Sequence, residues 1–270
     1  MSSSSTQFGV CVTCGVQFAA ADPARCPICE DARQYVPEEG QQWTNLDAVR
    51  RDHGNEIRDD AGIVGIGTEP SFAIGQRALL VPWRGSNLMW DCITLLDDET
   101  GAAVEARGGI AAIAISHPHY YSAVVEWAER FDCPVHLHEA DHEWVMRPSE
   151  RIEHWRGDTL ELGDGLTLVR CGGHFAGGTV LHWAGGDALL SGDIVQVIPD
   201  RRWVSFMYSY PNLIPLGEQA IRGIVDALEP YAFERIVGAW WGRVVRSEGK
   251  EIVRRSAERY LRALRGDAPA

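Results

Sequence analysis

Four of the seven cysteines in this chain form two Cys-x-x-Cys pairs near its start, Cys11 with Cys14 and Cys26 with Cys29. Two thiolate pairs on two tight turns suit a tetrahedral zinc ion, and Gly15 allows the left-handed backbone that such a turn commonly needs. The other three cysteines are scattered, so a disulfide framework would leave an odd thiol. The segment is too short to bury a core, and we expect bound metal to supply its folding free energy.

This segment resembles a zinc ribbon or a rubredoxin-like knuckle. The resemblance implies one structural zinc ion, with iron as an alternative. We assign the ribbon to residues 1–40 and interpret the polar stretch at 41–61 as a connector. The role expected for the ribbon is structural, or the binding of a protein partner.

The rest of the chain has an ordinary globular composition, with 45% hydrophobic residues. A formal net charge of −13 gives no generally basic surface, which disfavours nucleic acid or an anionic membrane as a partner. No apolar run approaches the roughly 20 residues that span a bilayer, and the first residues lack the basic and apolar parts of a signal peptide. We therefore expect a cytoplasmic protein that does not enter a membrane.

From Gly62 onward, short apolar runs bounded by glycine and proline predict strands. A helix predicted over Ala123–Phe131 lies between two of them, as in a crossover unit. The pattern then changes to hairpins, one of which turns at Gly185-Gly186-Asp187. Apolar stripes over Ile221–Leu228 and Ile252–Leu264 predict two closing helices. The predicted strands are Gly62–Gly67, Ser71–Ile74, Ala78–Val81, Leu88–Asp91, Ile110–Ile115, Val135–Leu137, Thr159–Leu162, Leu166–Arg170, Thr179–Trp183 and Ala188–Leu190.

Metal-binding side chains follow three of the predicted strands. His117 and His119 come after one run, His174 follows another in a glycine-rich loop, and Asp193 follows a third. Two histidines in one loop are by themselves more often solvated than bound to metal. Loops at strand ends carry the functional residues of layered α/β folds, so the repetition at three strand ends indicates a metal site.

The order, spacing and flanking glycines of these residues resemble the metallo-β-lactamase superfamily over residues 62–270. The resemblance implies an αββα sandwich in which two metal sites lie side by side. His117, His119 and His174 match the three histidines of the first site, and Asp193 matches the carboxylate that bridges both metals.

The ligands private to the second site are missing from the sequence. Tyr121 and Ser122 stand where an aspartate and a histidine of the family motif would be, and the segment 239–242 contains no histidine where the last ligand is expected. Random decay of an inactive site would spare neither set of ligands preferentially. A working single-metal site would lose only the ligands of the second metal. We therefore predict one catalytic metal ion.

The favoured function is a metal-dependent hydrolase that uses a single zinc-bound hydroxide on an unknown small-molecule substrate. Asp193 would bind the metal or orient the hydroxide, and Tyr121 would hydrogen-bond a developing oxyanion. Asp91, at the end of a strand, is a candidate for a residue that orients a metal ligand without binding the metal itself. The candidates for lining the substrate pocket are Trp203, Tyr208, Tyr210 and Trp241.

Two alternatives stay open. Two histidines with Asp193 would form the 2-His-1-carboxylate face of a mononuclear iron oxygenase acting on a thiol or persulfide, so iron is an alternative in this site too. A non-catalytic scaffold that binds a protein partner is the other. The remaining histidines match no ligand position of the family, and we expect His136, His138, His142 and His182 to be core or surface residues.

Overall fold

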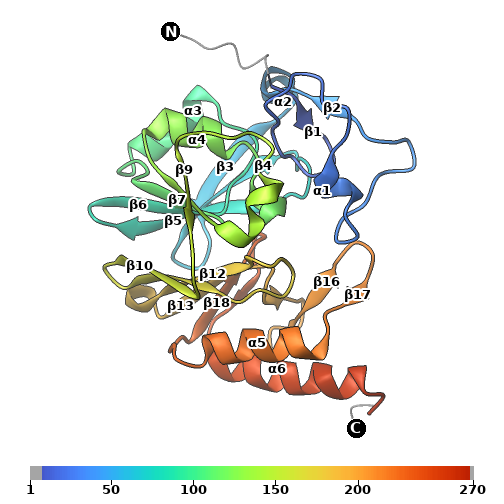
Figure 1. Cartoon of the computed structure of the whole chain (residues 1–270). Coiled ribbons are helices and arrows are strands. Elements are labelled where there is room, and N and C mark those ends of the chain that lie inside the picture. The colour runs from blue at the N-terminus through green and yellow to red at the C-terminus, as the bar shows by residue number, and fades with distance from the viewer. Residues whose placement is uncertain (1–7, 268–270) are drawn as a thin grey trace. The chain divides into compact units, whose positions relative to one another are not determined.

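Two compact units make up the chain. The structure, a computed structural model, describes residues 8–267. One unit contains residues 8–137 and 141–154, and the other contains residues 138–140 and 155–267 (Figure 1). Within the described residues, no helix is both long enough and apolar enough to cross a bilayer.

The cysteine-rich segment belongs to the first unit and has little regular structure. Strands β1 (Val10–Cys11) and β2 (Trp43–Thr44) pair in antiparallel fashion, and the short helix α1 (Pro27–Glu30) carries one of the cysteines. The segment 41–61, interpreted as a connector, contains β2, helix α2 (Leu46–Asp52) and strand β3 (Gly54–Asp59). Strand β3 pairs with the next strand along the chain, so the end of this segment is part of the main sheet.

A seven-stranded mixed sheet forms the body of the first unit. Its first four strands are antiparallel, and β6, β7 and β8 run parallel to one another. The carboxyl ends of β6 and β7 therefore meet at one edge of the sheet. In spatial order the strands are β3, β4 (Val64–Glu69), β5 (Arg77–Trp83), β6 (Ser86–Trp90), β7 (Ala112–Ala114), β8 (Val135–His138) and β9 (Ile152–Trp155).

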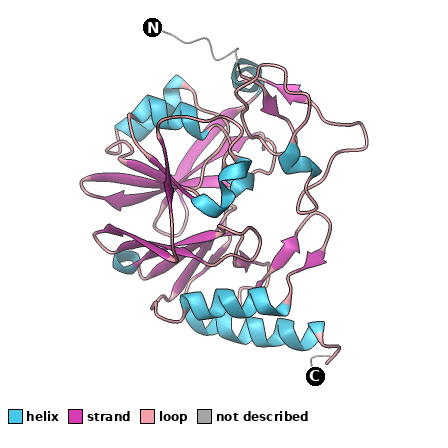
Figure 2. Ribbon diagram, in the orientation of Figure 1, coloured by secondary structure: helices cyan, strands magenta, loops and turns pink. Residues whose placement is uncertain are grey.

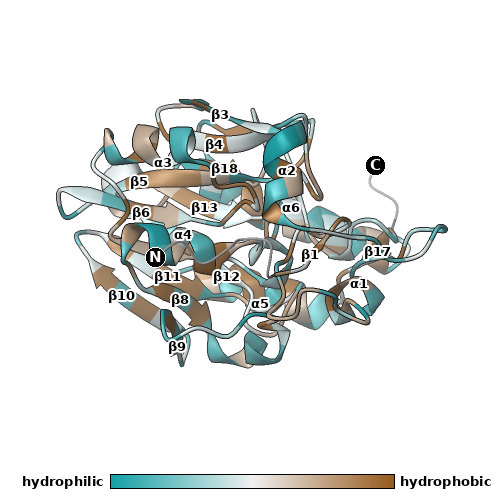
Figure 3. Cartoon of the chain, turned by 90° about the horizontal axis from the view of Figure 1, so that it is seen from above, coloured by the Kyte–Doolittle hydropathy of each residue, from teal (hydrophilic) through white to brown (hydrophobic). Residues whose placement is uncertain are grey.

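Burial explains why the central strands of this sheet read as continuous apolar runs. Residues 78–81 of β5 are all buried, and the strand is largely coloured as hydrophobic in Figure 3. Both faces are covered, so there is no alternation with polar residues. Helices α3 (Asp98–Glu105) and α4 (Val124–Phe131) pack on this unit, and α4 buries Val124, Val125, Trp127 and Ala128.

The second unit holds a six-stranded sheet with two long helices. Helices α5 (Glu218–Leu228) and α6 (Gly249–Leu264) lie side by side (Figure 2) and share one apolar core with the sheet. In spatial order the strands are β10 (Thr159–Gly163), β11 (Leu166–Arg170), β12 (Thr179–Trp183), β13 (Ala188–Gly192), β18 (Arg235–Gly238) and β19 (Val244–Val245). Two small hairpins lie between β13 and α5, formed by β14 (Gln196–Val197) with β15 (Val204–Ser205) and by β16 (Met207–Ser209) with β17 (Ile214–Pro215).

Most of the predicted elements are confirmed. The hairpins β10–β11 and β12–β13 are antiparallel as expected, and both closing helices form. The strand predicted at Ser71–Ile74 is wrong, because Ala73 and Gly75 have φ of 53° and 73° and the backbone turns there. A hydrogen bond from the Gly75 amide to the Phe72 carbonyl, at 3.0 Å, closes that turn.

Candidate metal centres

The four paired cysteines form a metal-binding cluster. Their sulfur atoms all lie within 4.8 Å of one another. The Sγ atoms of Cys11 and Cys29 are 3.6 Å apart, and those of Cys14 and Cys26 are 3.7 Å apart. Zinc–sulfur bonds of about 2.3 Å in a tetrahedron place two sulfurs about 3.8 Å from each other. The cluster therefore has the dimensions of a tetrahedral thiolate site, and the predicted four-cysteine ribbon is confirmed.

The backbone around the first cysteine pair forms the expected turn. The Gly15 amide donates to the Cys11 carbonyl at 2.8 Å, and the Cys11 amide donates to the Val16 carbonyl at 3.0 Å. Gly15 has a φ of 78°, a conformation that costs glycine little. On the other pair, the Gln41 side chain accepts from the Cys26 amide at 2.8 Å and donates to its carbonyl at 3.1 Å. Each half of the cluster is thus fixed by backbone contacts.

The ionisation of the four cysteine thiols favours a bound cation. Hydrogen bonds from the neighbouring thiols, Cys14 first, lower the pKa of Cys11, whereas the hydrogen bond with Cys11 raises the pKa values of Cys14 and Cys29. One buried thiolate thus suppresses ionisation of the others. A divalent ion removes this conflict, because metal ligation requires deprotonated sulfurs.

The loop after β7, residues 116–122, carries the first two histidines and is called the histidine loop below. His117 is extended, with φ of −170°, and a single 3₁₀ turn over Pro118–Tyr120 follows it. This change of backbone brings the rings of His117 and His119 to 5.1 Å between centroids, and both side chains are buried. Nδ1 of His117 lies 2.9 Å from Oγ of Ser116, which leaves Nε2 as its ligand atom.

Asp91 fixes the start of the histidine loop. It follows β6, the parallel neighbour of β7, and its Oδ1 accepts the Ser116 amide at 2.8 Å. The side chain is 1% exposed, and this burial raises the pKa of Asp91 to about 7. Asp91 thus orients the backbone next to His117.

His174 lies in the loop between β11 and β12 in the second unit. The amides of Cys171 and Gly172 both donate to the Gly178 carbonyl, at 2.8 and 2.9 Å, and close the loop. Nδ1 of His174 lies 2.8 Å from the Tyr208 carbonyl oxygen. A carbonyl oxygen only accepts, so this nitrogen carries the proton and the lone pair is on Nε2. The ring is oriented as a ligand through Nε2.

The other predicted site residues of the second unit divide into two places. Tyr210 lies beside His174, with ring centroids 5.8 Å apart, and its hydroxyl donates to the Asp193 carbonyl at 2.7 Å. Asp193 is buried at the end of β13, and Trp241 is partly buried after β18, the parallel neighbour of β13. Trp203 lies instead against α6, where the guanidinium of Arg259 is 4.5 Å from its ring centroid. The pocket role of these aromatic residues stays a prediction.

Tyr121 and Ser122, which replace two ligands of the family motif, are both buried. Burial raises the pKa of Tyr121 well above its usual range, so the phenol stays neutral. Tyr121 lines a small cavity together with Val16 and Gln17, which belong to the ribbon. The predicted role of Tyr121 as an oxyanion donor stays a prediction.

Two of the histidines expected to be core or surface residues, His138 and His182, have backbone partners. Nε2 of His138 lies 3.0 Å from the Gly157 carbonyl, and its Nδ1 accepts the Ala140 amide at 3.1 Å. Nε2 of His182 lies 2.8 Å from the Ala232 carbonyl. Both nitrogens of His138 are thus occupied within its own unit. His117, His119 and His174 are three buried imidazoles that could bind a metal ion.

Solved structures similar to this chain define its fold. The metallo-β-lactamase DIM-1 aligns with a TM-score of 0.59 and 15% identity, covering 77% of this chain and 97% of that one. The mono-zinc form of FIM-1 from Pseudomonas aeruginosa aligns at 0.56 and 12%, covering 80% and 97%. The chemotaxis sensor ODP, solved as a peroxy diiron species, aligns at 0.52 and 16%, covering 76% and 92%. The chain therefore has the metallo-β-lactamase fold, which confirms the predicted fold class.

Sequence comparison places the chain more closely. No family model matches it. It is 49% identical over 268 residues to the protein of Bacillus subtilis strain 168 named "Uncharacterized protein YmaE", covering 96% of this chain and 97% of that protein. The chain belongs to the same family as YmaE.

Proposed function

We propose that the chain is a metal-dependent hydrolase with one catalytic zinc ion, held by His117, His119 and His174. The observation that carries this proposal is the make-up of the candidate ligand set, which among the described residues consists of three buried imidazoles and no carboxylate. Neutral ligands leave the full charge on the ion. That charge supports a hydrolytic zinc site with an open position better than it supports the 2-His-1-carboxylate face of an iron oxygenase.

Zinc in such a site supplies a water molecule whose pKa is lowered from 15.7 to about 7, and hence a nucleophile at neutral pH. The chain's own contribution is to hold the imidazoles in the required tautomers. The Tyr208 carbonyl holds the proton of His174 on Nδ1, and the Ser116 hydroxyl is placed to do the same for His117. Such partners fix the direction of the ligand lone pair.

Asp193 and Tyr121 are the proposed catalytic residues beyond the ligands. Asp193 would accept a hydrogen bond from the nucleophilic water, as a buried carboxylate that directly follows β13 in the same unit as His174 can. Tyr121 would donate to negative charge that develops on the substrate, which a neutral phenol can do. Tyr208, Tyr210 and Trp241 would line the pocket of a small-molecule substrate.

Metal analysis of the purified protein tests the proposal. We expect two zinc ions per chain in the wild type and one in His174→Ala, with a cooperative melt retained because the strands supply a core independent of the ion. His182→Ala is the matched control, since it removes a buried histidine of the same unit whose Nε2 already contacts a carbonyl, and it should keep both ions.

Three results would contradict the proposal. One zinc with one iron would favour the oxygenase. A single metal ion that disappears in a Cys11→Ser, Cys14→Ser variant would favour the scaffold. The third result concerns the hydrolysis of model esters, thioesters, amides and phosphoesters. Equal rates in wild type and His174→Ala would show that the histidine site does not carry the activity.

A further inference from the structure

The ribbon is hydrogen-bonded directly to the histidine loop. The Gln17 amide, three residues after the second cysteine, donates to the Ser122 carbonyl at 2.9 Å. Ser122 is the last residue of the loop that carries His117 and His119. Both partners are buried, with Gln17 2% and Ser122 3% exposed. One backbone hydrogen bond therefore joins the cysteine cluster to the loop of the proposed catalytic ligands.

Ser122 is a position where the loop needs such a hold. Its φ is 46°, in the left-handed region that is unfavourable for a residue with a side chain. A residue keeps this backbone conformation only where several surrounding contacts hold it in place. Three contacts do so here: the Gln17 amide donates to its carbonyl at 2.9 Å, the Gln76 side chain donates to its hydroxyl at 3.0 Å, and that hydroxyl donates to the Cys92 carbonyl at 3.3 Å. The ribbon supplies one of the three, and it is the one that holds the backbone carbonyl.

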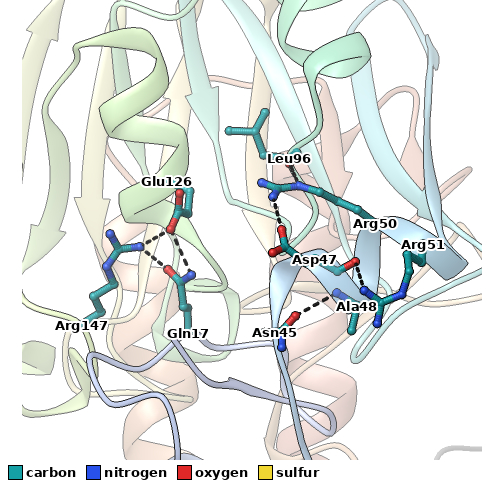
Figure 4. Close-up of polar contacts among 9 residues, drawn as sticks. All are labelled: Gln17, Asn45, Asp47, Ala48, Arg50, Arg51, Leu96, Glu126 and Arg147. Atoms are coloured by element: carbon teal, nitrogen blue, oxygen red, sulfur yellow. Dashed lines mark hydrogen bonds and ion pairs between the residues drawn. The ribbon is translucent and has the colours of Figure 1, made fainter. Parts of the chain in front are cut away.

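The Gln17 side chain extends this connection to helix α4, which begins just after the loop. Its Nε2 donates to Oε1 of Glu126 at 3.2 Å, and its Oε1 accepts from Arg147 (Figure 4). Arg147 in turn pairs with Glu126 at 2.6 Å, and their side chains are only 9% and 17% exposed. Because this charge pair is shielded from solvent, it fixes Gln17 more firmly than a surface contact would.

A second link joins the ribbon to the strand region before the loop. The Thr94 hydroxyl donates to the Gly15 carbonyl at 2.8 Å, within the turn that follows Cys14. The approach is close, since a Cβ at Gly15 would lie 2.5 Å from this hydroxyl. Thr94 is 4% exposed and follows Asp91, the residue that fixes the start of the loop, by three positions.

We propose that the ribbon is a positioning element for the histidine loop, with Gln17 and Thr94 as its positioning residues. Metal in the cysteine cluster sets the turn that presents the Gly15 carbonyl and the Gln17 amide, and these hold the loop in the shape that directs His117 and His119. Loss of the ribbon metal then loosens the loop and weakens metal binding by the histidines. The inference rests on the proposed function for the role of the two histidines as ligands.

Substitutions at the two links test the proposal in the full-length protein. Thr94→Val removes the donor to Gly15 at almost constant volume, Thr94→Ser restores it, and Gln17→Ala removes the side chain that contacts Glu126. Thr100→Val is the matched control, because Thr100 is a buried threonine of the same unit whose hydroxyl accepts from Asn55. Two quantities are measured. One is the rate of hydrogen exchange in peptides covering 116–122, and the other is the apparent zinc affinity of the histidine site in a chelator competition.

We expect Thr94→Val and Gln17→Ala to keep the ribbon zinc and each to speed hydrogen exchange of the loop about 2- to 10-fold. A variant that carries both substitutions should bind zinc at the histidines about 5- to 150-fold more weakly than wild type. Thr94→Ser and Thr100→Val should behave as wild type. Unchanged exchange and affinity in both link variants would overturn the positioning role. If the wild type bound no metal at the histidines, the proposed function would fail, and the exchange measurement would still decide this inference.

Discussion

Replacing Ser116 by alanine is a selective test of how the site is held. Ser116 is 1% exposed, and its hydroxyl lies 2.9 Å from Nδ1 of His117. The backbone amide that donates to Asp91 is kept in the alanine variant. The substitution thus removes one hydroxyl and leaves all three imidazoles in place.

The expected loss follows from the burial of that contact. A neutral hydrogen bond contributes about 0.5–1.5 kcal/mol, and a buried N–H left without its partner costs about 1–3 kcal/mol. Since about 1.4 kcal/mol corresponds to tenfold in affinity, Ser116→Ala should weaken zinc binding by roughly 10- to 100-fold, the range found for residues behind metal ligands. The stability of the metal-free protein should change by much less than that of the zinc complex.

Chelator competition with zinc on wild type, Ser116→Ala and Ser191→Ala measures this effect. Ser191 is a fully buried serine whose hydroxyl donates to the Val195 carbonyl at 2.8 Å and is the matched control. Its variant should keep wild-type affinity at the histidines. Equal affinities in all three proteins would refute the argument that the Ser116 hydroxyl orients His117.

Four further predictions follow from the same structure. Asp60→Asn should lower the free energy of unfolding by about 3–5 kcal/mol in urea melts, because it removes the negative charge 2.9 Å from the buried guanidinium of Arg77. An added Arg77→Met should recover most of the loss. In the metal-free protein, the raised pKa of Asp91 means that the folded state binds its proton more tightly. The contribution of Asp91 to stability should be largest below about pH 4 and fall by up to about 4 kcal/mol as pH rises to about 7, so the stability of Asp91→Asn relative to wild type should rise over that range. A strong chelator should remove the ribbon zinc and unfold residues 8–40, seen as loss of their protected amides, and amides that stayed protected would contradict the metal requirement. Anomalous diffraction should show a single ion at the histidines, whereas two full peaks about 3.5–4 Å apart would end the single-metal prediction.

Sequence reasoning identified side chains that could bind a metal and missed most of the groups that orient them. Histidine and cysteine are recognisable because few residue types bind zinc and because their spacing reflects turns and strand ends. The Tyr208 carbonyl on His174 left no sequence signal, because a backbone oxygen is present at every position. The contacts of Gln17 and Thr94 could not be predicted either, because the sequence does not show which group a buried glutamine or threonine will bond.

The sequence by itself determined the local features of this protein. Apolar periodicity specified the helices α4, α5 and α6, glycine and proline marked the turns, and the cysteine spacing specified the ribbon. Each of these depends on residues close together in the chain. The tertiary structure alone decided the long-range contacts, such as the Gln17 amide on Ser122 and the Gln17 side chain on Arg147, 130 residues away. Those contacts depend on strand order and packing, in which many residues contribute small energies together, so no short segment of the sequence encodes them.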